Sequence, residues 1–551
     1  MRNKLKKNTF IQGTLIASAS LIFIKILGAL YVIPFYKIIG EGGGTLYSYA
    51  YNIYSLFLNI STAGIPIAMS MIISEYMALE MYDAKERSKK VGTKIIACLA
   101  ILSFCLVFFG SHVLAGFLLS DVTGGHSIEE VSLVIKAISF CLIIIPFLSV
   151  LRGYLQGHKF VAPTSYSRVI EQIIRILIVL VGSYVAIKVL KYNTAVGVSV
   201  ALTGAFFGGL IAYLYLIIKI KKNKESFPVA EKKDSVKNKT LAKKILTYSI
   251  PIVMVAIIDN LYTLVDIKLI VKGLNMVGYT ALESQTVSGI VATWAPKICT
   301  IIIAIATALT TNIIPHVTTS YIKKDMNGVI FRVNQALCTM LLITLPMSLL
   351  LFLLSNEAYS IFYGSSAYGG LILKFSAISH IFFGLWSVLN TSLQSMKKFK
   401  IIYLNSAVGL TCNALLDIPL ILLFSKVGIS PYIATVVATC IGYAISITIV
   451  LLYLKKNMNF NYKATLKTLR MLILPILLVF IPVFLSKHFI TFEYTRLNSI
   501  ISVMIHGIVG VIIYLFVTYK NGALRDVMGN DSVDKIMYKL HLKKRENNEE
   551  A

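Results

Sequence analysis

The sequence predicts an all-α integral membrane protein with fourteen transmembrane helices, in which two parallel six-helix repeats are followed by two further helices. Three observations support this fold class. Hydrophobic residues occupy 57% of the 551 positions and charged residues only 14%, far from the balance of a soluble domain. Long apolar segments recur along the whole chain. Finally, 38 of the 53 lysines and arginines lie in every second connection between these segments.

The apolar segments are long enough to cross a membrane, which requires about 20 mostly apolar residues per helix. Their expected positions are 10–39, 45–75, 95–119, 131–151, 162–187, 195–218, 245–270, 286–312, 331–355, 367–396, 401–425, 432–454, 471–486 and 497–519. The first segment is too long for the apolar core of a signal peptide, and no small-residue cleavage site follows it. We therefore expect it to be retained as a helix.

The distribution of positive charge predicts the orientation of these helices. The eight alternate pieces that include both termini hold 38 lysines and arginines, whereas the seven connections on the other side hold six. Short cytoplasmic loops are enriched in these residues. We therefore expect a multi-pass protein of the cell membrane with both termini in the cytoplasm. The net charge of +28 follows from this topology, so we expect no nucleic-acid partner.

A long basic linker separates the sixth segment from the seventh and suggests a boundary between two halves. The predicted organisation is an N-terminal lobe at 1–218, the cytoplasmic linker at 219–244, a C-terminal lobe at 245–454, two extra helices within 455–519 and a basic cytoplasmic tail at 520–551.

An internal repeat supports the division into two halves. Residues 149–159 read SVLRGYLQGHK and residues 387–397 read SVLNTSLQSMK, with six identities in eleven positions at an offset of 238. The same offset carries the start of the first segment onto the start of the seventh. Because six helices return the chain to the same side of the membrane, the repeats are parallel. Transporters built from such repeats hold their substrate at the interface between them.

The residue types that support metal, redox or group-transfer chemistry are not grouped in this sequence. All seven cysteines fall inside apolar segments without CxxC pairs, so we expect no disulfide framework, metal site or cofactor. The eight histidines are scattered, and the connections hold no acidic cluster of the kind that a polysaccharide polymerase or glycosyltransferase needs. We therefore do not expect an enzyme.

Two stretches of the first half carry a family resemblance. Residues 30–70, LYVIPFYKIIGEGGGTLYSYAYNIYSLFLNISTAGIPIAMS, and residues 151–176, LRGYLQGHKFVAPTSYSRVIEQIIRI, resemble the YtgP/MurJ-type flippases of Gram-positive bacteria. These flippases belong to the multidrug/oligosaccharidyl-lipid/polysaccharide exporter superfamily, together with the sporulation paralogue SpoVB. The similarity extends over the whole chain, although its specific motifs lie mainly in the first half.

The resemblance implies a two-lobed exporter with a central cavity that works by alternating access. It also implies a substrate, an undecaprenyl-diphosphate-linked sugar and chiefly the peptidoglycan precursor lipid II. We therefore expect a flippase that moves lipid II from the inner to the outer leaflet. Its expected partners are this anionic lipid-linked oligosaccharide and the bilayer, and we expect the protein to act as a monomer.

The chain departs from the family pattern at charged positions. The arginine that usually precedes the LG pair of the first helix is Lys25 here. Further arginines of related proteins correspond to Tyr31 and to Leu58–Asn59. What the family implies about individual site residues therefore transfers to Lys25 only. Asn59 is a further candidate substrate-binding residue.

Ionisable side chains within membrane spans are expensive and usually mark a pathway or a buried pair. We expect Lys25 to face the cavity and bind the diphosphate; the alternative is a lysine that extends outward to the membrane surface. Lys297 follows Pro296, and a proline can bend a helix, so Lys297 is a second candidate substrate contact. Asp259 lies halfway across its span. It either pairs with Lys25 or Lys297 until substrate arrives, binds a coupling cation, or forms a permanent salt bridge.

A second set of charged residues is expected to form gate or structural ion pairs. Arg168, Glu171 and Arg175 are spaced by three and four residues and therefore share one helix face. A buried triad is the favoured interpretation, and a headgroup site or cytoplasmic gate is the alternative. Asp266 and Lys268 are expected near the outer rim.

Four further polar residues have simpler expected roles. Arg152 and His158, at the inner end of the fourth span, are expected to contact lipid phosphates. Asn413 and Asp417 share a face of the eleventh span, and we expect an internal polar contact there.

Glycines and a proline mark two candidate hinges. The sequence GEGGG at 40–44 joins the first two spans, so Gly42, Gly43 and Gly44 are predicted to form a hinge of the outer gate; a plain tight turn is the alternative. Gly64 and Pro66 interrupt the second span. Discontinuous helices occur where the backbone lines a cavity.

Two other functions remain open for this sequence. A MATE-like drug or cation antiporter of the same superfamily would need an acidic or aromatic cavity, to which Asp259 could contribute. Export of another lipid-linked oligosaccharide, including that of a spore-cortex paralogue, is the other alternative.

Overall fold

The computed structural model is helical throughout the part of the chain that it describes. This part comprises residues 16, 20, 23–62, 64–119, 124–158, 160–227, 236–310, 314–489, 495–530 and 533–534. Its regular elements are α-helices with short 3₁₀ and π segments, and these described residues include no strand.

The predicted fold class, an all-α integral membrane protein, is confirmed. Twelve of the described helical segments are long and apolar enough to cross a membrane, and they fall on the third to fourteenth predicted spans. A thirteenth candidate is a broken span in which the helix Phe23–Leu30 meets α2 (Val32–Thr62) at 43°.

The helix α2 covers the end of the first predicted span and most of the second. It is kinked at Gly40, whose φ of 69° and ψ of −176° are non-helical. Only glycine adopts such a conformation without strain. The connection predicted at 40–44 is therefore a single residue, because the chain is helical again from Glu41 onward.

Clustering of contacts divides the chain into two compact units. Unit 1 comprises Met1–Trp294 and Asn413–Thr435, and unit 2 comprises Ala295–Cys412 and Val436–Ala551. The division passes through helices and does not follow the linker at 219–244, so the N- and C-terminal lobes of the sequence analysis stay a prediction.

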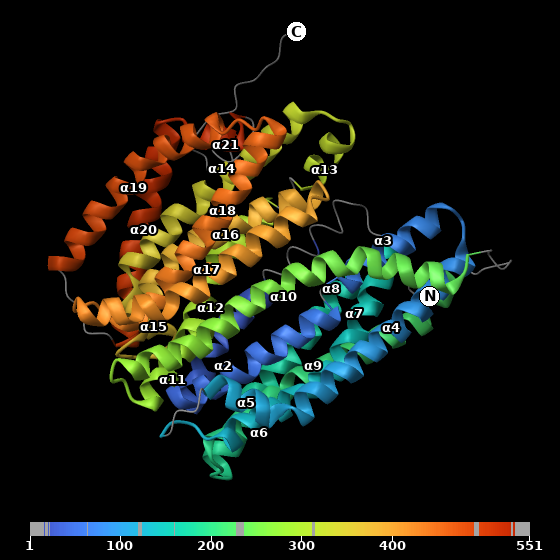
Figure 1. Ribbon diagram of the computed structural model, residues 1–551, viewed down its shortest axis with the longest axis horizontal. Helices are drawn as coiled ribbons and strands as arrows, with labels where there is room; N and C mark the ends of the chain where they lie inside the picture. The colour runs from blue at the N-terminus through green and yellow to red at the C-terminus, as the bar shows by residue number, and fades with distance from the viewer. Residues whose placement is uncertain are drawn as a thin grey trace, which may run out of the picture. The chain divides into compact units, whose positions relative to one another are not determined.

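Unit 1 contains the helices from α2 to η4 together with residues 413–435 from a later part of the chain (Figure 1). Beyond α2, its elements are α3 (Ile65–Ala78), α4 (Tyr82–Phe109), α5 (Ser111–Leu119), α6 (Ile128–Ser139), α7 (Cys141–Gly157), α8 (Val161–Leu177), η1 (Ile178–Gly182), η2 (Val185–Val189), α9 (Thr194–Lys222), η3 (Lys224–Ser226), α10 (Asn238–Met276), α11 (Ala281–Gly289), η4 (Ile290–Trp294) and η5 (Pro431–Ile433). Within it, α2 packs against α10 and also against α6, α7 and α9.

Unit 2 contains the remaining helices, with α17 and α18 crossing the boundary between the units. Its elements are α12 (Ala295–Thr310), α13 (Ile314–Ile322), α14 (Met326–Leu353), α15 (Ser355–Tyr363), α16 (Gly369–Ser395), α17 (Phe399–Lys426), α18 (Ala434–Met458), α19 (Lys463–Phe489), α20 (Arg496–Lys520) and α21 (Ala523–Met528). Within it, α14 packs against α12, α16 and α19.

Both units combine an apolar core with an apolar outer surface. One core of unit 1 joins residues of α3, α4, α7, α9 and α10, and one core of unit 2 joins residues of α14, α19, α20 and α21. Large apolar side chains remain exposed along α19 and α20, for example Leu474, Leu477, Ile508 and Phe516. An apolar exposed surface of this kind suits contact with lipid rather than water.

The internal repeat recurs in the contacts. Arg152 Nε donates a hydrogen bond to Ser167 Oγ at 2.9 Å, and Asn405 Nδ2 donates one to Asn390 Oδ1 at 3.0 Å. The two pairs are related by the offset of 238 that the sequence predicted. Gly40 also has a counterpart at this offset, Gly278, which shares its positive φ.

Candidate functional site

Close packing of two helices orients the charged face of α8. A Cβ added at Gly208 of α9 would lie 2.5 Å from the Glu171 carbonyl oxygen, and one at Gly204 would lie 2.9 Å from that of Arg175. Such close backbone approach is a known use of small residues between membrane helices. Because α9 fits against the backbone of α8 here, the long charged side chains of α8 extend toward other neighbours.

An ion-pair network links α7 to α8. The Glu171 carboxylate accepts from Arg152 Nη2 at 2.9 Å and from Arg175 Nη2 at 2.7 Å. The three side chains are 14%, 13% and 26% exposed, respectively. Within the described residues, Arg168 forms no ion pair. The structure thus brings together Glu171 and Arg175, and adds Arg152 in the place that Arg168 has in the predicted triad.

Sequence analysis missed the partnership of Arg152 because the contact is not local. The sequence did contain a signal for this contact, because few residues separate the end of α7 from the start of α8. In two helices connected so closely, residues at a similar distance from the connection can lie opposite each other. Arg152 and Ser167 stand in this relation, which explains the hydrogen bond from Arg152 Nε. His158, at the end of α7, donates from Nδ1 to the Tyr154 carbonyl oxygen, and its burial lowers the pKa of the imidazole to about 4.

Tyrosines of α2 face the network. Tyr47, Tyr51 and Tyr54 follow at spacings of four and three, which places them on one face. Ring centroids of Tyr47 and Tyr51 are 5.8 Å apart, and those of Tyr51 and Tyr54 are 6.2 Å apart. All three phenol groups interact electrostatically with the guanidinium of Arg175. Cations favour such aromatic surroundings, so α2 completes a cationic, aromatic centre within unit 1.

A second polar centre of unit 1 is acidic. Asn413 Nδ2 of α17 donates to Asp266 Oδ1 of α10 at 2.5 Å, and the carboxyl of Asp417 interacts with that of Asp266. The three side chains are almost completely buried. Neighbouring carboxylates repel, so this pair needs a proton or a cation between its oxygens. In contrast, Lys268 places its ammonium 4.0 Å from the Phe117 ring centroid.

Buried hydrogen bonds join α2 to the segment formed by α11 and η4. Ser48 Oγ and Thr293 Oγ1 are 2.6 Å apart, and Tyr49 Oη lies 2.8 Å from Ser288 Oγ. Trp294 Nε1 donates to the Gly44 carbonyl oxygen at 3.1 Å. The π-helical turn η4 contains Thr293 and Trp294. Such turns displace side chains relative to a regular helix and are frequent at functional sites.

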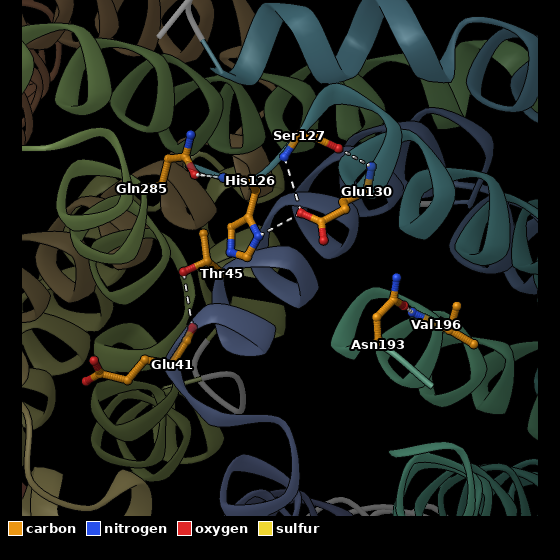
Figure 2. A network of polar contacts seen from close by, with 8 residues as sticks. All are labelled: Glu41, Thr45, His126, Ser127, Glu130, Asn193, Val196 and Gln285. Atoms are coloured by element: carbon orange, nitrogen blue, oxygen red, sulfur yellow. Dashed lines mark hydrogen bonds and ion pairs between the residues drawn. The ribbon is translucent and has the colours of Figure 1, made fainter. Parts of the chain in front are cut away.

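A surface network ties the same segment to the start of α6 (Figure 2). The backbone N–H of His126 donates to Gln285 Oε1 at 2.8 Å, and His126 Nδ1 lies 3.3 Å from Glu130 Oε2. Glu130 also closes the capping box with Ser127 that starts α6. These contacts fix the connection before α6 against α11.

The predicted hinge residues lie at tight contacts. A Cβ at Gly43 would lie 2.7 Å from Thr194 Cγ2, one at Gly44 2.9 Å from Trp294 Nε1, and one at Gly64 2.5 Å from the Ser249 carbonyl oxygen. Gly42 is near His126, at 3.5 Å for an added Cβ. Pro66 stands in the first turn of α3, a position that a proline tolerates. These glycines permit close packing, while the backbone turn itself belongs to Gly40.

The candidate substrate-binding residues are distributed over several elements. Lys25 is exposed on the helix Phe23–Leu30, and Asn59 is half-buried on α2. Asp259 lies on α10, but its side chain is outside the described part of the structure. Lys297 is half-buried on α12 in unit 2. The proposal that these residues share one site stays a prediction. Among the described residues, no group of three histidines, cysteines or acidic residues could hold a metal ion.

Comparisons with known proteins place this geometry in context. Residues 10–292 match the family model described as polysaccharide biosynthesis protein. The chain is 29% identical over 545 residues to the lipid II flippase MurJ of Bacillus subtilis (strain 168), which covers 96% of this chain and 97% of that protein. It is 25% identical to stage V sporulation protein B of the same organism, over 74% of this chain and 76% of the relative.

Solved structures share the fold. A lipid II flippase MurJ in an inward closed conformation superimposes with a TM-score of 0.68 at 18% identity, covering 93% of this chain and all of that one. An inward-facing multidrug resistance MATE family transporter gives a TM-score of 0.60 at 11% identity, covering 80% of this chain and 98% of that one.

Proposed function

Because this chain belongs to the polysaccharide biosynthesis protein family, we propose that it is a membrane flippase for a lipid-linked oligosaccharide, with lipid II as its substrate. The observation that carries this proposal is the similarity to the lipid II flippase MurJ, which extends over nearly the full length of both chains. The protein moves its substrate between leaflets and makes or breaks no covalent bond in it, so it is a transporter and not an enzyme.

The proposed mechanism is alternating access. In a state open to the cytoplasm, polar groups inside the protein admit the anionic diphosphate and its sugars, while the polyprenyl tail remains in the bilayer. The protein then opens to the outside and releases the headgroup there. Both termini lie in the cytoplasm. A membrane potential that is negative inside favours the outward movement of negative charge, by about 2.3 kcal/mol per elementary charge per 100 mV.

We assign substrate contacts to Lys25, Lys297 and Asn59, with Asp259 as the group that pairs with a lysine when no substrate is bound. Lysines bind phosphate as point charges, without the two-pronged geometry of arginine.

A second function has support from one observation, the buried carboxyl pair of Asp266 and Asp417. Such a pair is suited to bind and release a proton or cation, as a MATE-like antiporter requires. The cationic centre around Glu171 argues against a cationic cargo in unit 1, because like charges repel. The similarity to stage V sporulation protein B also keeps a spore-cortex glycolipid as a possible cargo.

Complementation tests the proposed function. The chain would be expressed in a bacterium whose own lipid II flippases can be shut off, alongside a Lys25→Ala variant at equal membrane level. We expect growth with the intact chain and loss of growth with the variant. Absence of rescue by the intact, correctly inserted chain would remove lipid II as the substrate. Equal rescue by both chains would retain the substrate and remove Lys25 as an essential contact.

A further inference from the structure

The cationic centre of unit 1 holds more positive than negative charge. Arg152 and Arg175 form ion pairs with Glu171. Arg168 interacts electrostatically with both Arg152 and Glu171. Arginine stays protonated in proteins. Two guanidinium groups therefore contact one carboxylate and a third lies three residues away on the same helix face, so these four described side chains carry a net charge of +2.

This surplus lies within membrane-spanning helices. Arg175 is in the middle of the span Val161–Val189, and Arg168 is nearer its start. Arg152 lies close to the end of the span Ile128–Gly157. Uncompensated charge inside a membrane is expensive, and a buried ion pair with an unequal number of partners loses much of its stabilisation. An anion that joins the cluster during function would compensate this surplus.

The cluster retains hydrogen-bond donors for such an anion. Glu171 uses one oxygen for each of its two arginine partners. The Nε of Arg175 is buried and has no hydrogen-bond partner in the described structure, and Arg168 forms no ion pair there. Arginine donors bind phosphate oxygens in a fixed, forked geometry. Unused guanidinium donors in a buried place thus indicate a phosphate-like ligand.

The surroundings extend the cluster toward a larger headgroup. The phenol groups of Tyr47, Tyr51 and Tyr54 interact electrostatically with Arg175, and of the three only Tyr51 is more than 6% exposed. The helix that carries Lys25 passes close by, since a Cβ at Gly28 would lie 3.7 Å from Gln172 Nε2. Lys25 and Gly28 are three residues apart and share a face.

We propose that Arg152, Arg168 and Arg175, held by Glu171, form the binding site for the diphosphate of the lipid-linked substrate. A diphosphate that links a polyprenol to a sugar carries two negative charges, which matches the surplus of the cluster. Glu171 is the positioning residue, because it fixes Arg152 and Arg175 without contacting the anion itself. This inference rests on the proposed function for the identity of the lipid, whereas the charge and donors of the cluster by themselves point to a diphosphate group.

A binding experiment on the purified full-length chain tests the site. The probes are undecaprenyl diphosphate and undecaprenyl monophosphate, with the bound fraction measured by native mass spectrometry in detergent. The variants are Arg168→Gln and Arg175→Gln. Arg332→Gln on α14 is the matched control, because Arg332 contacts Gln335 and lies outside the cluster. Thermal unfolding of each variant shows whether it is folded.

We expect the intact chain to bind the diphosphate at least about tenfold more tightly than the monophosphate, since a charge-assisted hydrogen bond contributes roughly that factor. Each cluster variant should lose about tenfold in affinity for the diphosphate, and the control should lose none. Equal affinity of the intact chain and a folded Arg168→Gln variant for the diphosphate would overturn the site, as would equal binding of both lipids by the intact chain.

Complementation with the same variants separates this inference from the proposed function. Rescue by the intact chain and by both cluster variants leaves the flippase proposal standing and overturns the site. Diphosphate binding that depends on Arg168 and Arg175 in a chain that fails to rescue supports the site and rejects lipid II as the cargo.

Discussion

At the scale of single residues, the ion-pair partners of a charged side chain matter more for stability than its charge alone. Among the residues that the structure describes, Glu171 is the one carboxylate in ion-pair contact with Arg152 and Arg175. Its loss would leave these guanidinium groups adjacent to each other within the membrane spans. Removing one member of a buried ion pair is more costly than exchanging the whole pair for apolar residues.

The first prediction concerns this residue. We expect Glu171→Gln to reduce the free energy of unfolding by about 3–5 kcal/mol, measured by thermal unfolding of the purified protein in detergent. The control is Glu283→Gln, because Glu283 caps the start of α11 close to the surface. A variant of Glu171 as stable as the intact chain would show that the arginines do not depend on it.

The same residues show what a sequence can reveal about a site. The spacing of Glu171 and Arg175 on one helix was enough to predict that they lie together, because neighbours at i and i+4 share a face. The contact with Arg152 depends on how α7 packs against α8, and the electrostatic interaction of Arg175 with Tyr54 depends on how α2 packs. Such packing is set by many side chains at once, so charge and spacing alone do not reveal it.

At the scale of helices, glycines decide how closely the elements approach. The apolar segments predicted the helices well, since length and hydrophobicity determine which segments cross a membrane. The ends were less accurate: the loop predicted at 40–44 reduces to the kink at Gly40. A cluster of glycines resembles a loop in the sequence, whereas Gly43 and Gly44 instead allow α2 to contact Thr194 and Trp294.

The second prediction follows from the contact between Gly64 and α10. A Cβ at Gly64 would lie 2.5 Å from the carbonyl oxygen of Ser249, and backbone atoms cannot turn aside as a side chain can. We expect Gly64→Ala to cost about 1–3 kcal/mol through overpacking, seen as a lower midpoint of thermal unfolding. Gly116 is the control because no atom lies within 4 Å of its added Cβ, and Gly116→Ala should be neutral or slightly stabilising. Equal midpoints for the two variants would contradict this account.

At the scale of the whole molecule, the repeat places opposite chemistry at equivalent positions. The offset of 238 relates the pair Arg152–Ser167 to Asn390–Asn405, and it also relates Arg175 to Asn413. One position therefore belongs to the cationic centre, and its counterpart contacts the carboxylate of Asp266. A duplicated framework that keeps its hydrogen bonds while its charges diverge can serve two tasks. We infer that the cationic centre suits the anionic cargo and the acidic pair suits a proton or cation.

The last prediction concerns the opening of the molecule. Ser48 of α2 and Thr293 of η4 belong to different predicted repeats but to the same compact unit, and their buried hydroxyls are 2.6 Å apart. If transport requires α2 to separate from η4, a covalent bond between these positions must stop it. Two cysteines at positions so close can form a disulfide, which requires Cβ atoms about 3.5–4.5 Å apart.

We therefore expect Ser48→Cys combined with Thr293→Cys to support growth in the complementation assay under reducing conditions. Growth should cease after oxidation, while each single variant should grow under both conditions. Full growth of cells whose protein is shown to be cross-linked would mean that these helices move together throughout the cycle, and the outward opening would have to occur elsewhere.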